Sequence, residues 1–219
     1  MTTFRPEATW PTGNRIAAKA MRNLRKGEFT KMRLLNKLTK GIHILWSRLT
    51  QQGLRVTALW AADHAVRIVT GAPIRRVSQI TPHLHVGGQY RRRGWPRLAA
   101  RGITAVVNVR VEFDDNDAGI APPRYLHLPT VDDEPPTLEQ LRAGAAFIAE
   151  EITRGGGVYV HCKAGVGRAA TVAAAYLVST GLTPDQAWAR IGEVRPFVRP
   201  KPRQVAQVGR FAGTVDGRR

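Results

Sequence analysis

A short apolar run that leads through a glycine-rich loop into an alanine-rich helix is the feature that most constrains this chain. Residues 158–160 are Val-Tyr-Val, typical of a buried strand, and residues 168–177 carry strong helix formers. Gly165 and Gly167 allow the backbone to curl between the two elements at little steric cost. A second apolar run, at residues 103–109, has the composition of a buried parallel strand. We therefore predict an α/β fold whose central, mostly parallel sheet is flanked by helices.

The loop has the properties of an anion site. A junction between a strand and a helix N-terminus directs backbone N–H groups and the positive end of the helix dipole at one point. The chain's only cysteine, Cys162, stands at the start of this loop, and Arg168 stands at its end. The N–H groups and the arginine would stabilise the thiolate form that acts as a nucleophile. An arginine can also hold two phosphate oxygens at once. The pattern indicates a phosphate group that is bound and then attacked.

This segment is similar to the phosphate loop of a known family. His161-Cys162, five further residues and Arg168 resemble the HCxxGxxR motif of the cysteine-dependent phosphatases, specifically their dual-specificity branch. The resemblance covers residues 75–213, and Thr-Val-Asp at 130–132, Pro-Thr-Leu at 136–138 and His-Cys-Lys-Ala-Gly at 161–165 are most similar to the mitochondrial-type phosphatidylglycerophosphate phosphatases. It implies the cysteine-phosphatase fold and hydrolysis of phosphate monoesters through a phosphocysteine intermediate. A purely structural cysteine is disfavoured because loop, helix and arginine agree with one another.

The resemblance also implies roles for individual residues. Cys162 is the nucleophile, and Asp132 is the acid that protonates the leaving group and the base that later activates water. Asp133 is the alternative for that role. His161 is expected to pack under the loop and to donate a hydrogen bond that fixes it. The residues expected to bind the phosphate are Lys163, Ala164, Gly165, Val166, Gly167 and Arg168.

Two positions beside the loop bear on substrate and rate. Lys163 is expected to face the mouth of the pocket, where a positive charge suits a substrate with more than one anionic group. Ala169 departs from the family pattern, because the residue after the loop arginine is usually Ser or Thr, whose hydroxyl assists the thiolate as a leaving group. Thr171 lies half a turn too far on to be an assured substitute. The departure predicts slow breakdown of the phosphoenzyme, or a weak enzyme that mainly binds phosphates.

Other charged runs are interpreted as solvated. One is the basic run at residues 91–93, and the other is an acidic segment whose spacing matches no metal site. Its members are Glu112, Asp114, Asp115 and Asp117. With a single cysteine the chain forms neither an internal disulfide nor a cysteine-based zinc site, so we expect no metal and no cofactor. A free catalytic thiol needs a reducing, cytosol-like compartment.

The charge of the chain is large and unevenly placed. Its 219 residues, 43% of them hydrophobic, suffice for one domain with an extension. The net charge is +18, of which residues 1–77 contribute +12, from 15 Lys and Arg against Glu7, Glu28 and Asp63. A field of this sign favours anionic partners. Basic or acidic residues interrupt every apolar run before it reaches the length of a membrane span.

The N-terminal part is expected to consist of a disordered basic tail at residues 1–30 and a basic helical extension at residues 31–72. The extension has a first amphipathic helix from Lys31, with basic residues beside an apolar stripe, and a second helix over residues 55–70 that stops at Gly71. The stripe consists of Leu34, Leu35, Leu38, Ile42, Leu45, Trp46 and Leu49. Two interpretations stay open for this pair: an anchor on an anionic membrane surface, or an extension that packs on the catalytic domain. The catalytic domain is expected over residues 73–213, followed by a tail at 214–219.

Further strands are predicted at residues 80–88 and 125–128. Capping boxes predict two helix starts, one at Thr137 with Gln140 and one at Thr183 with Gln186, and a closing helix is expected over residues 204–211. Because open α/β sheets place their sites at the carboxyl ends of strands, the loop at residues 131–136 should meet the cysteine loop at one edge.

The predicted function is therefore that of a phosphatase of the dual-specificity protein phosphatase class. The first alternative is a phospholipid-headgroup phosphatase that acts on phosphatidylglycerophosphate or a phosphoinositide. The second is a phosphate-binding pseudo-phosphatase or an RNA 5′-phosphatase, although the chain lacks an RNA-binding motif and nucleic acid is not an expected partner. The expected partners are a phosphorylated protein or phospholipid and an anionic membrane surface reached through residues 31–72. We expect a cytoplasmic protein, peripheral at the inner membrane surface.

Overall fold

The computed structural model describes residues 13–216, and of residues 13–38, 40 and 216 it describes the backbone alone. The chain divides into two compact units, the first ending at Gly53 and the second beginning at Leu54. The second unit therefore begins ahead of the expected domain start at Pro73. Residues 13–30, expected to be disordered, are helical, and residues 1–12 lie outside the described residues. Of the expected tail at 214–219, residues 214–216 belong to the last helix, and residues 217–219 lie outside the described part.

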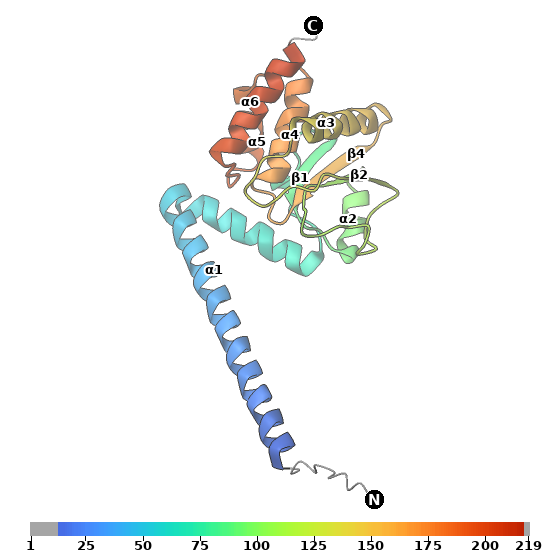
Figure 1. Cartoon of the computed structure of the whole chain (residues 1–219). Helices are drawn as coiled ribbons and strands as arrows, with labels where there is room; N and C mark the ends of the chain where they lie inside the picture. Colours follow the sequence, from blue (N-terminus) through green and yellow to red (C-terminus); the bar gives the residue numbers. More distant parts are fainter. Residues whose placement is uncertain (1–12, 217–219) are drawn as a thin grey trace, which may run out of the picture. The chain divides into compact units, whose positions relative to one another are not determined.

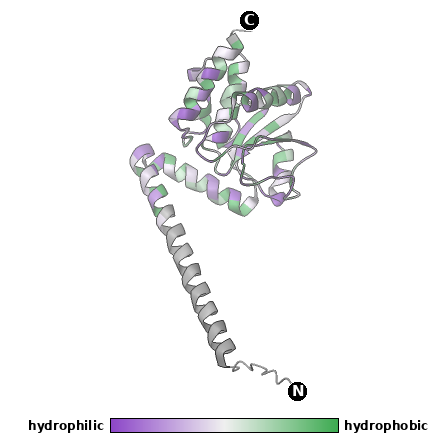
Figure 2. Cartoon of the chain, viewed as in Figure 1, coloured by the Kyte–Doolittle hydropathy of each residue, from purple (hydrophilic) through white to green (hydrophobic). Residues whose placement is uncertain are grey.

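Helix α1 (Gly13–Thr70) consists of two arms separated at Gly53, whose φ of 80° and ψ of 168° interrupt the helix. Such a backbone conformation is accessible to glycine and rare for other residues. The second arm, residues 54–70, alternates hydrophobic and hydrophilic residues along its length (Figure 2) and ends at Gly71, where φ is 82°. Within the part of the chain that the structure describes, no helix has both the length and the apolar character needed to cross a membrane.

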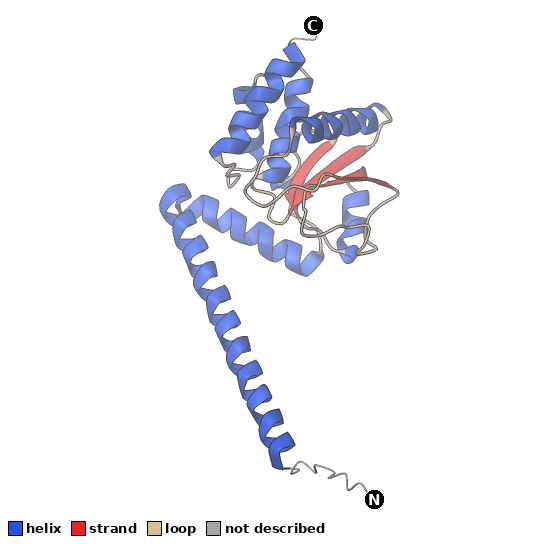
Figure 3. Ribbon diagram, in the orientation of Figure 1, coloured by secondary structure: helices blue, strands red, loops and turns tan. Residues whose placement is uncertain are grey.

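A four-stranded parallel sheet lies at the centre of the second unit (Figure 3). Its order is β1 (Leu84–Gly88), β4 (Gly157–Cys162), β2 (Ile103–Asn108) and β3 (Arg124–His127). Every residue of β4 is buried, as expected for a strand with neighbours on both sides and helices on both faces. The expected first strand is shorter than predicted, because residues 80–83 form a turn in which Ile80 N donates to Leu84 O at 2.8 Å.

The two faces of the sheet carry different cores. Val158 and Val160 of β4 belong to the larger core, with α3 (Leu138–Thr153), α4 (Arg168–Ser179), α5 (Pro184–Val194) and α6 (Pro202–Asp216), which Figure 1 shows gathered on one side of the sheet. Tyr159, which points the other way along the strand, belongs to a smaller core with Tyr90 and with Leu98 of α2 (Trp95–Ala99). Two short 3₁₀ helices, Arg75–Val77 and Arg92–Gly94, complete the unit.

Helix α4 is central to the larger core. All its residues from 168 to 178 are buried, and its run of alanines lets β4, α3, α5 and α6 approach it closely. Both predicted capping boxes are confirmed: Thr137 with Gln140 opens α3, and Thr183 with Gln186 opens α5. These caps satisfy backbone donors that a helix start leaves open. The first turn of α4 has no side-chain cap, and its N-terminus therefore remains available to an anion.

His85 on β1 makes stability sensitive to acid. Its side chain is 1% exposed, and neither ring nitrogen has a hydrogen-bond partner. Burial, and to a smaller extent the positive charge of Arg101, lower its pKa from 6.5 to about 4. Because the unfolded chain takes up this proton near pH 6.5 and the folded chain only near pH 4, folding stability decreases as the pH falls through that window. At about 1.4 kcal/mol per pKa unit, the total loss is on the order of 3 kcal/mol.

We predict that His85→Phe flattens this acid dependence. The variant should lose less thermal stability between pH 7 and pH 4.5 than the native chain does, measured by circular dichroism melts at several pH values. His83→Gln is the matched control, because His83 is exposed on the turn before the same strand. An unchanged acid dependence in His85→Phe would contradict the assignment to His85.

Candidate active site

The loop at residues 163–167 joins the end of β4 to the start of α4, as predicted. Four consecutive carbonyls of this loop accept hydrogen bonds from donors outside it. These are Lys163 O from Gln89 N at 3.2 Å, Ala164 O from Arg195 Nη2 at 3.3 Å, Gly165 O from Arg195 Nε at 2.6 Å and Val166 O from Arg199 N at 2.7 Å. Because the C=O and N–H of one trans peptide group point in opposite directions, the N–H groups of residues 164–167 face the inside of the loop. The result is a concave set of donors for an anion.

Cys162 lies at the inside of this loop. It is a free, buried thiol, 4% exposed, and its sulfur accepts a hydrogen bond from Gly165 N at 3.3 Å. Gly165 has a φ of 68°, and a Cβ there would lie 2.2 Å from the carbonyl carbon of Gly87 on β1. Only glycine fits this position. The loop therefore packs directly on the end of β1, with its donors turned to the sulfur.

No side-chain hydroxyl from the first turn of α4 reaches the sulfur of Cys162. Ala169 offers no hydroxyl, and the hydroxyl of Thr171 donates to Gly167 O at 3.1 Å, four residues back in the helix. The expectation that Thr171 is not an assured substitute for the missing hydroxyl is consistent with this contact. Stabilisation of a thiolate at Cys162 is left to the backbone donors, the helix N-terminus and the positive charge of Arg168.

Arg168 is held by two carboxylates. Its side chain is 1% exposed. Its two terminal nitrogens donate end-on to the carboxylate of Glu112, Nη1 to Oε2 at 2.8 Å and Nη2 to Oε1 at 3.0 Å. Nη1 also donates to Thr130 O at 2.8 Å, and Nη2 lies 2.8 Å from Asp132 Oδ1. The sequence-predicted residues Arg168 and Asp132 are thus in contact, although they come from different loops.

The remaining donors of Arg168 fit a phosphate. A guanidinium has five N–H groups, and Nε of Arg168 is buried without a partner. Glu112 occupies the end-on pair, which leaves Nε and the Nη2 donor now facing Asp132 as the side-on pair. A phosphate that binds side-on would therefore displace Asp132 alone, while Glu112 keeps the guanidinium plane in place.

Glu112 is a site residue that the sequence interpretation missed. The hydrogen bond from Arg168 is the main cause that lowers its pKa from 4.5 to about 2, although partial burial opposes the shift. Glu112 therefore stays ionised across the ordinary pH range. Glu112 is exposed, as the interpretation of residues 112–117 as a solvated loop predicted, but that interpretation missed its contact with Arg168, 56 positions away in the sequence.

Asp115 corrects the same interpretation. Its side chain is fully buried and pairs with His161, also fully buried, at 2.6 Å between Oδ2 and Nε2. Asp114 accepts a hydrogen bond from Tyr125 Oη at 2.7 Å. The acidic segment thus folds back onto the sheet. The expected hydrogen bond of His161 to the cysteine loop is replaced by this bond to Asp115, and the ring stacks on Tyr159 beneath the loop.

Asp132 and Asp133 occupy different environments. Asp132 faces Arg168, whereas Asp133 lies 3.4 Å from Lys201 Nζ and has a φ of 64°. Both side chains are more than two-thirds exposed. Lys163 is exposed, as expected for a residue at the mouth of the site. The contact with Arg168 favours Asp132 over Asp133 as the acid.

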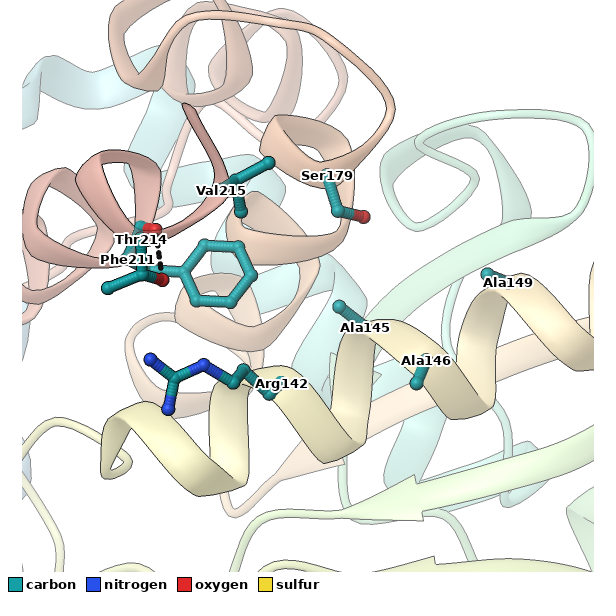
Figure 4. A pocket seen from close by; sticks show the side chains of 8 residues that line it. All are labelled: Arg142, Ala145, Ala146, Ala149, Ser179, Phe211, Thr214 and Val215. Carbon is teal, nitrogen blue, oxygen red and sulfur yellow. Dashed lines mark hydrogen bonds between the residues drawn. The ribbon is translucent and has the colours of Figure 1, made fainter. Parts of the chain in front are cut away.

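A separate hollow of about 460 Å³ lies away from this chemistry, between α3, α4 and α6 (Figure 4). Alanines of α3 line one side, and Phe211 and Val215 of α6 line the other. Its lining residues include no Cys, His or carboxylate, and the hydroxyls of Ser179 and Thr214 donate to backbone carbonyls of their own helices. Within the described residues, no three His, Cys, Asp or Glu side chains are placed to share a metal ion.

Comparison with known proteins agrees with this geometry. Residues 84–212 match the family model described as the catalytic domain of dual specificity phosphatases. Protein phosphatase Slingshot homolog 3 of Rattus norvegicus is 30% identical over 148 residues, which are 66% of this chain and 22% of that protein. Phosphatidylglycerophosphatase and protein-tyrosine phosphatase 1 of Homo sapiens is 37% identical over 84 residues, 38% of this chain and 42% of that protein.

A solved structure shows the same fold. The crystal structure of PTPMT1 in complex with PI(5)P matches with a TM-score of 0.58 at 26% identity, over 64% of this chain and 96% of that one. The resemblance inferred from the sequence is thereby confirmed, as is the parallel sheet flanked by helices. The chain spans less than half the length of either curated relative described above.

We predict that Glu112→Gln weakens catalysis by misaligning Arg168. The glutamine amide would present an N–H group to one terminal nitrogen of Arg168, so one of the two hydrogen bonds to Glu112 would be lost. The Nε and Nη2 donors of Arg168 would then no longer be held in position for the phosphate. We expect kcat/KM for an aryl phosphate to fall roughly tenfold, equivalent to about 1.4 kcal/mol. Asp117→Asn, an exposed change on the same segment, should leave kcat/KM unchanged. A kcat/KM that is unchanged in Glu112→Gln, or that falls equally in Asp117→Asn, would contradict a role of Glu112 in aligning Arg168.

Proposed function

Because the chain belongs to the dual-specificity phosphatase family, we propose that it hydrolyses phosphate monoesters through a phosphocysteine at Cys162. The observation that carries the proposal is the loop itself, in which outward carbonyls leave a set of N–H donors around the sulfur while Arg168 stands at the other end. A phosphate bound there would have its phosphorus next to a nucleophile and its oxygens next to donors.

In the first step, Cys162 Sγ forms a bond to phosphorus as the bond to the ester oxygen breaks. The electron pair goes to the departing oxygen, which takes a proton from Asp132. The contact between Asp132 and Arg168 supports this assignment, since a phosphate that takes the Nη2 donor would release the carboxyl beside the ester oxygen. Asp132 must carry a proton at that moment.

In the second step, water attacks phosphorus and the bond between sulfur and phosphorus breaks. Asp132, now ionised, accepts the proton of the water. The thiolate leaves with stabilisation from the loop N–H groups, the helix N-terminus and the charge of Arg168, without a side-chain hydroxyl at position 169. We therefore expect this step to be the slower one.

For the substrate class we propose a phosphorylated protein, with a phospholipid headgroup as the alternative. The name of the Slingshot relative describes a protein phosphatase, whereas that of the human relative includes phosphatidylglycerophosphatase. Lys163 at the mouth of the site favours substrates with a second anionic group. A panel of phosphotyrosine and phosphothreonine peptides, phosphatidylglycerophosphate, phosphoinositides and 5′-triphosphate RNA distinguishes these classes by their kcat/KM values.

We predict that Cys162→Ser abolishes turnover of an aryl phosphate. The variant should still bind inorganic tungstate, because the N–H donors of the loop remain and only the nucleophile is lost. Rapid quenching of the native chain with substrate, followed by mass spectrometry, should reveal one added phosphoryl group on the peptide that contains Cys162. Turnover in Cys162→Ser, or a phosphoryl group on another residue, would overturn the covalent mechanism.

We predict that the loss of kcat in Asp132→Asn depends strongly on the leaving group of the substrate. Alkyl phosphates, whose leaving oxygen needs a proton, should lose roughly a hundredfold or more in kcat, and aryl phosphates with acidic phenols should lose far less. Asp133→Asn is the matched control, because it changes the adjacent carboxylate that faces Lys201. If Asp133→Asn alone gave the selective loss, the acid would have to be reassigned by one residue.

We further propose that the first arm of α1, residues 13–52, binds an anionic membrane surface, which makes the protein peripheral on the cytoplasmic side. Ile42, Leu45, Trp46 and Leu49 recur at helical spacing with 67%, 48%, 67% and 37% exposure. Lys residues at 31, 37 and 40 precede them in the sequence. Each basic residue near an anionic surface adds on the order of 1 kcal/mol of attraction.

We predict that the full chain sediments with vesicles that contain phosphatidylserine and not with neutral phosphatidylcholine vesicles, and that added salt weakens the binding. Ile42→Ser should reduce it. Ile44→Ser is the matched control, because Ile44 is also exposed but lies on the opposite side of the helix. Equal sedimentation of the two variants, or no preference for anionic lipid, would overturn the membrane proposal.

A further inference from the structure

A buried arginine connects the phosphate loop to the second arm of α1. Arg195, which follows α5, is fully buried and donates through Nε to Gly165 O at 2.6 Å and through Nη2 to Ala164 O at 3.3 Å. Its other terminal nitrogen, Nη1, donates to Val77 O at 2.7 Å. Two of the four outward carbonyls of the loop therefore depend on one guanidinium.

Asp63 on the second arm supplies the countercharge for that guanidinium. Its Oδ2 lies 3.4 Å from Arg195 Nη2, and its side chain is 4% exposed. Burial lowers the pKa of Arg195, and the charge of Asp63 opposes that shift. The other carboxylate oxygen, Oδ1, accepts from Ile74 N at 2.9 Å, which fixes the orientation of the group. A buried cation without such a partner would be costly.

Arg67, one turn further along the arm, contacts the loop directly. Its Nη1 donates to Gln89 O at 3.0 Å and to Lys163 O at 3.4 Å. The guanidinium passes over Gly88 of β1, where a Cβ would lie 2.6 Å from Arg67 Cζ. Asp63 and Arg67 are four residues apart and therefore share one face of the helix. This face, and not an apolar stripe alone, meets the phosphate loop.

The arm is held in place at its end. Arg93 donates to the carbonyls of Ile68 and Val69, which are among the last carbonyls of the helix. Arg93 is exposed, in agreement with the interpretation of residues 91–93 as a solvated basic run, and it makes these bonds at the surface. A Cβ at Gly71 would lie 2.6 Å from Gly94 N, so the turn after the helix packs closely against the segment that contains Arg93 and Gly94.

We propose that Asp63 and Arg67 are positioning residues for the phosphate loop, Asp63 through Arg195 and Arg67 through Lys163 O. By keeping the carbonyls of residues 163–165 turned outward, they keep the N–H groups turned toward the anion. The catalytic unit of this chain then includes residues 54–70, which lie outside the region matched by the family model. The inference deepens the proposed phosphatase function, and its test also has readouts that do not need turnover.

The experiment compares Arg67→Gln with Arg55→Gln in the full chain. Both remove one positive charge from the second arm, but Arg55 is exposed on it. Arg67→Gln should weaken binding of inorganic tungstate, measured by calorimetry, roughly fivefold. Hydrogen exchange at amides 163–167 should rise in the same variant, and Arg55→Gln should match the native chain in both measurements. Arg67→Lys keeps a donor at this position and should recover part of the affinity.

Asp63→Asn tests the route through Arg195. It should weaken tungstate binding in the native background and have no further effect in an Arg195→Gln background, since Asp63 acts through that residue. If Asp63→Asn does not fold, tungstate affinity and hydrogen exchange in Arg67→Gln and Arg67→Lys test the inference. Unchanged tungstate affinity and unchanged exchange at 163–167 in the folded variants would overturn the inference. A native chain that binds tungstate without turnover would overturn the proposed function and leave the inference standing.

Discussion

Four successive peptide groups that turn their N–H donors to one side are the constraint on which this structure depends. Such an arrangement leaves four carbonyls on the opposite side, and buried carbonyls need donors. Gln89, which follows β1, and Arg195 and Arg199, in the connection between α5 and α6, provide them. The loop is therefore shaped by its outer surroundings as much as by its own glycines. Segments as remote as residues 54–70 become part of the site, because one of these donors is buried and needs a countercharge.

Carboxylates balance the positive charge of the site before any phosphate binds. Arg168 is almost fully buried, and Glu112 and Asp132 both contact it. The two carboxylates differ in exposure and in the number of contacts with Arg168. Glu112 is 35% exposed and accepts from both terminal nitrogens, whereas Asp132 is 69% exposed and contacts one. A dianionic phosphate can therefore replace the weaker partner without losing the stronger one. The displaced carboxyl is the one that the proposed chemistry needs beside the leaving oxygen.

The strand, loop and helix around Cys162 were predictable because their signals are local: β-branched residues, glycines and helix formers follow one another directly. Both capping boxes were confirmed for the same reason. Glu112 and Asp115 were missed because their roles depend on partners 56 and 46 positions away. Spacing within the acidic segment carries no information about such partners. Arg195 gave no local signal at all, and Asp63 looked like an isolated acid on a basic helix until the fold placed it beside that arginine.

Ala169 links the orientation of the loop N–H donors to the rate at which the phosphocysteine is hydrolysed. The hydroxyl of Thr171 is committed to Gly167 O, so the sulfur of Cys162 has Gly165 N as its described donor. When the bond between sulfur and phosphorus breaks, the negative charge returns to that sulfur, and the loop N–H groups, the N-terminus of α4 and the charge of Arg168 stabilise it. Any change that turns these donors away therefore acts on the leaving thiolate as well as on the bound phosphate. In this chain the outer supports of the loop, Arg195 with Asp63 and Arg67, take on the greater importance because no side-chain hydroxyl shares their task.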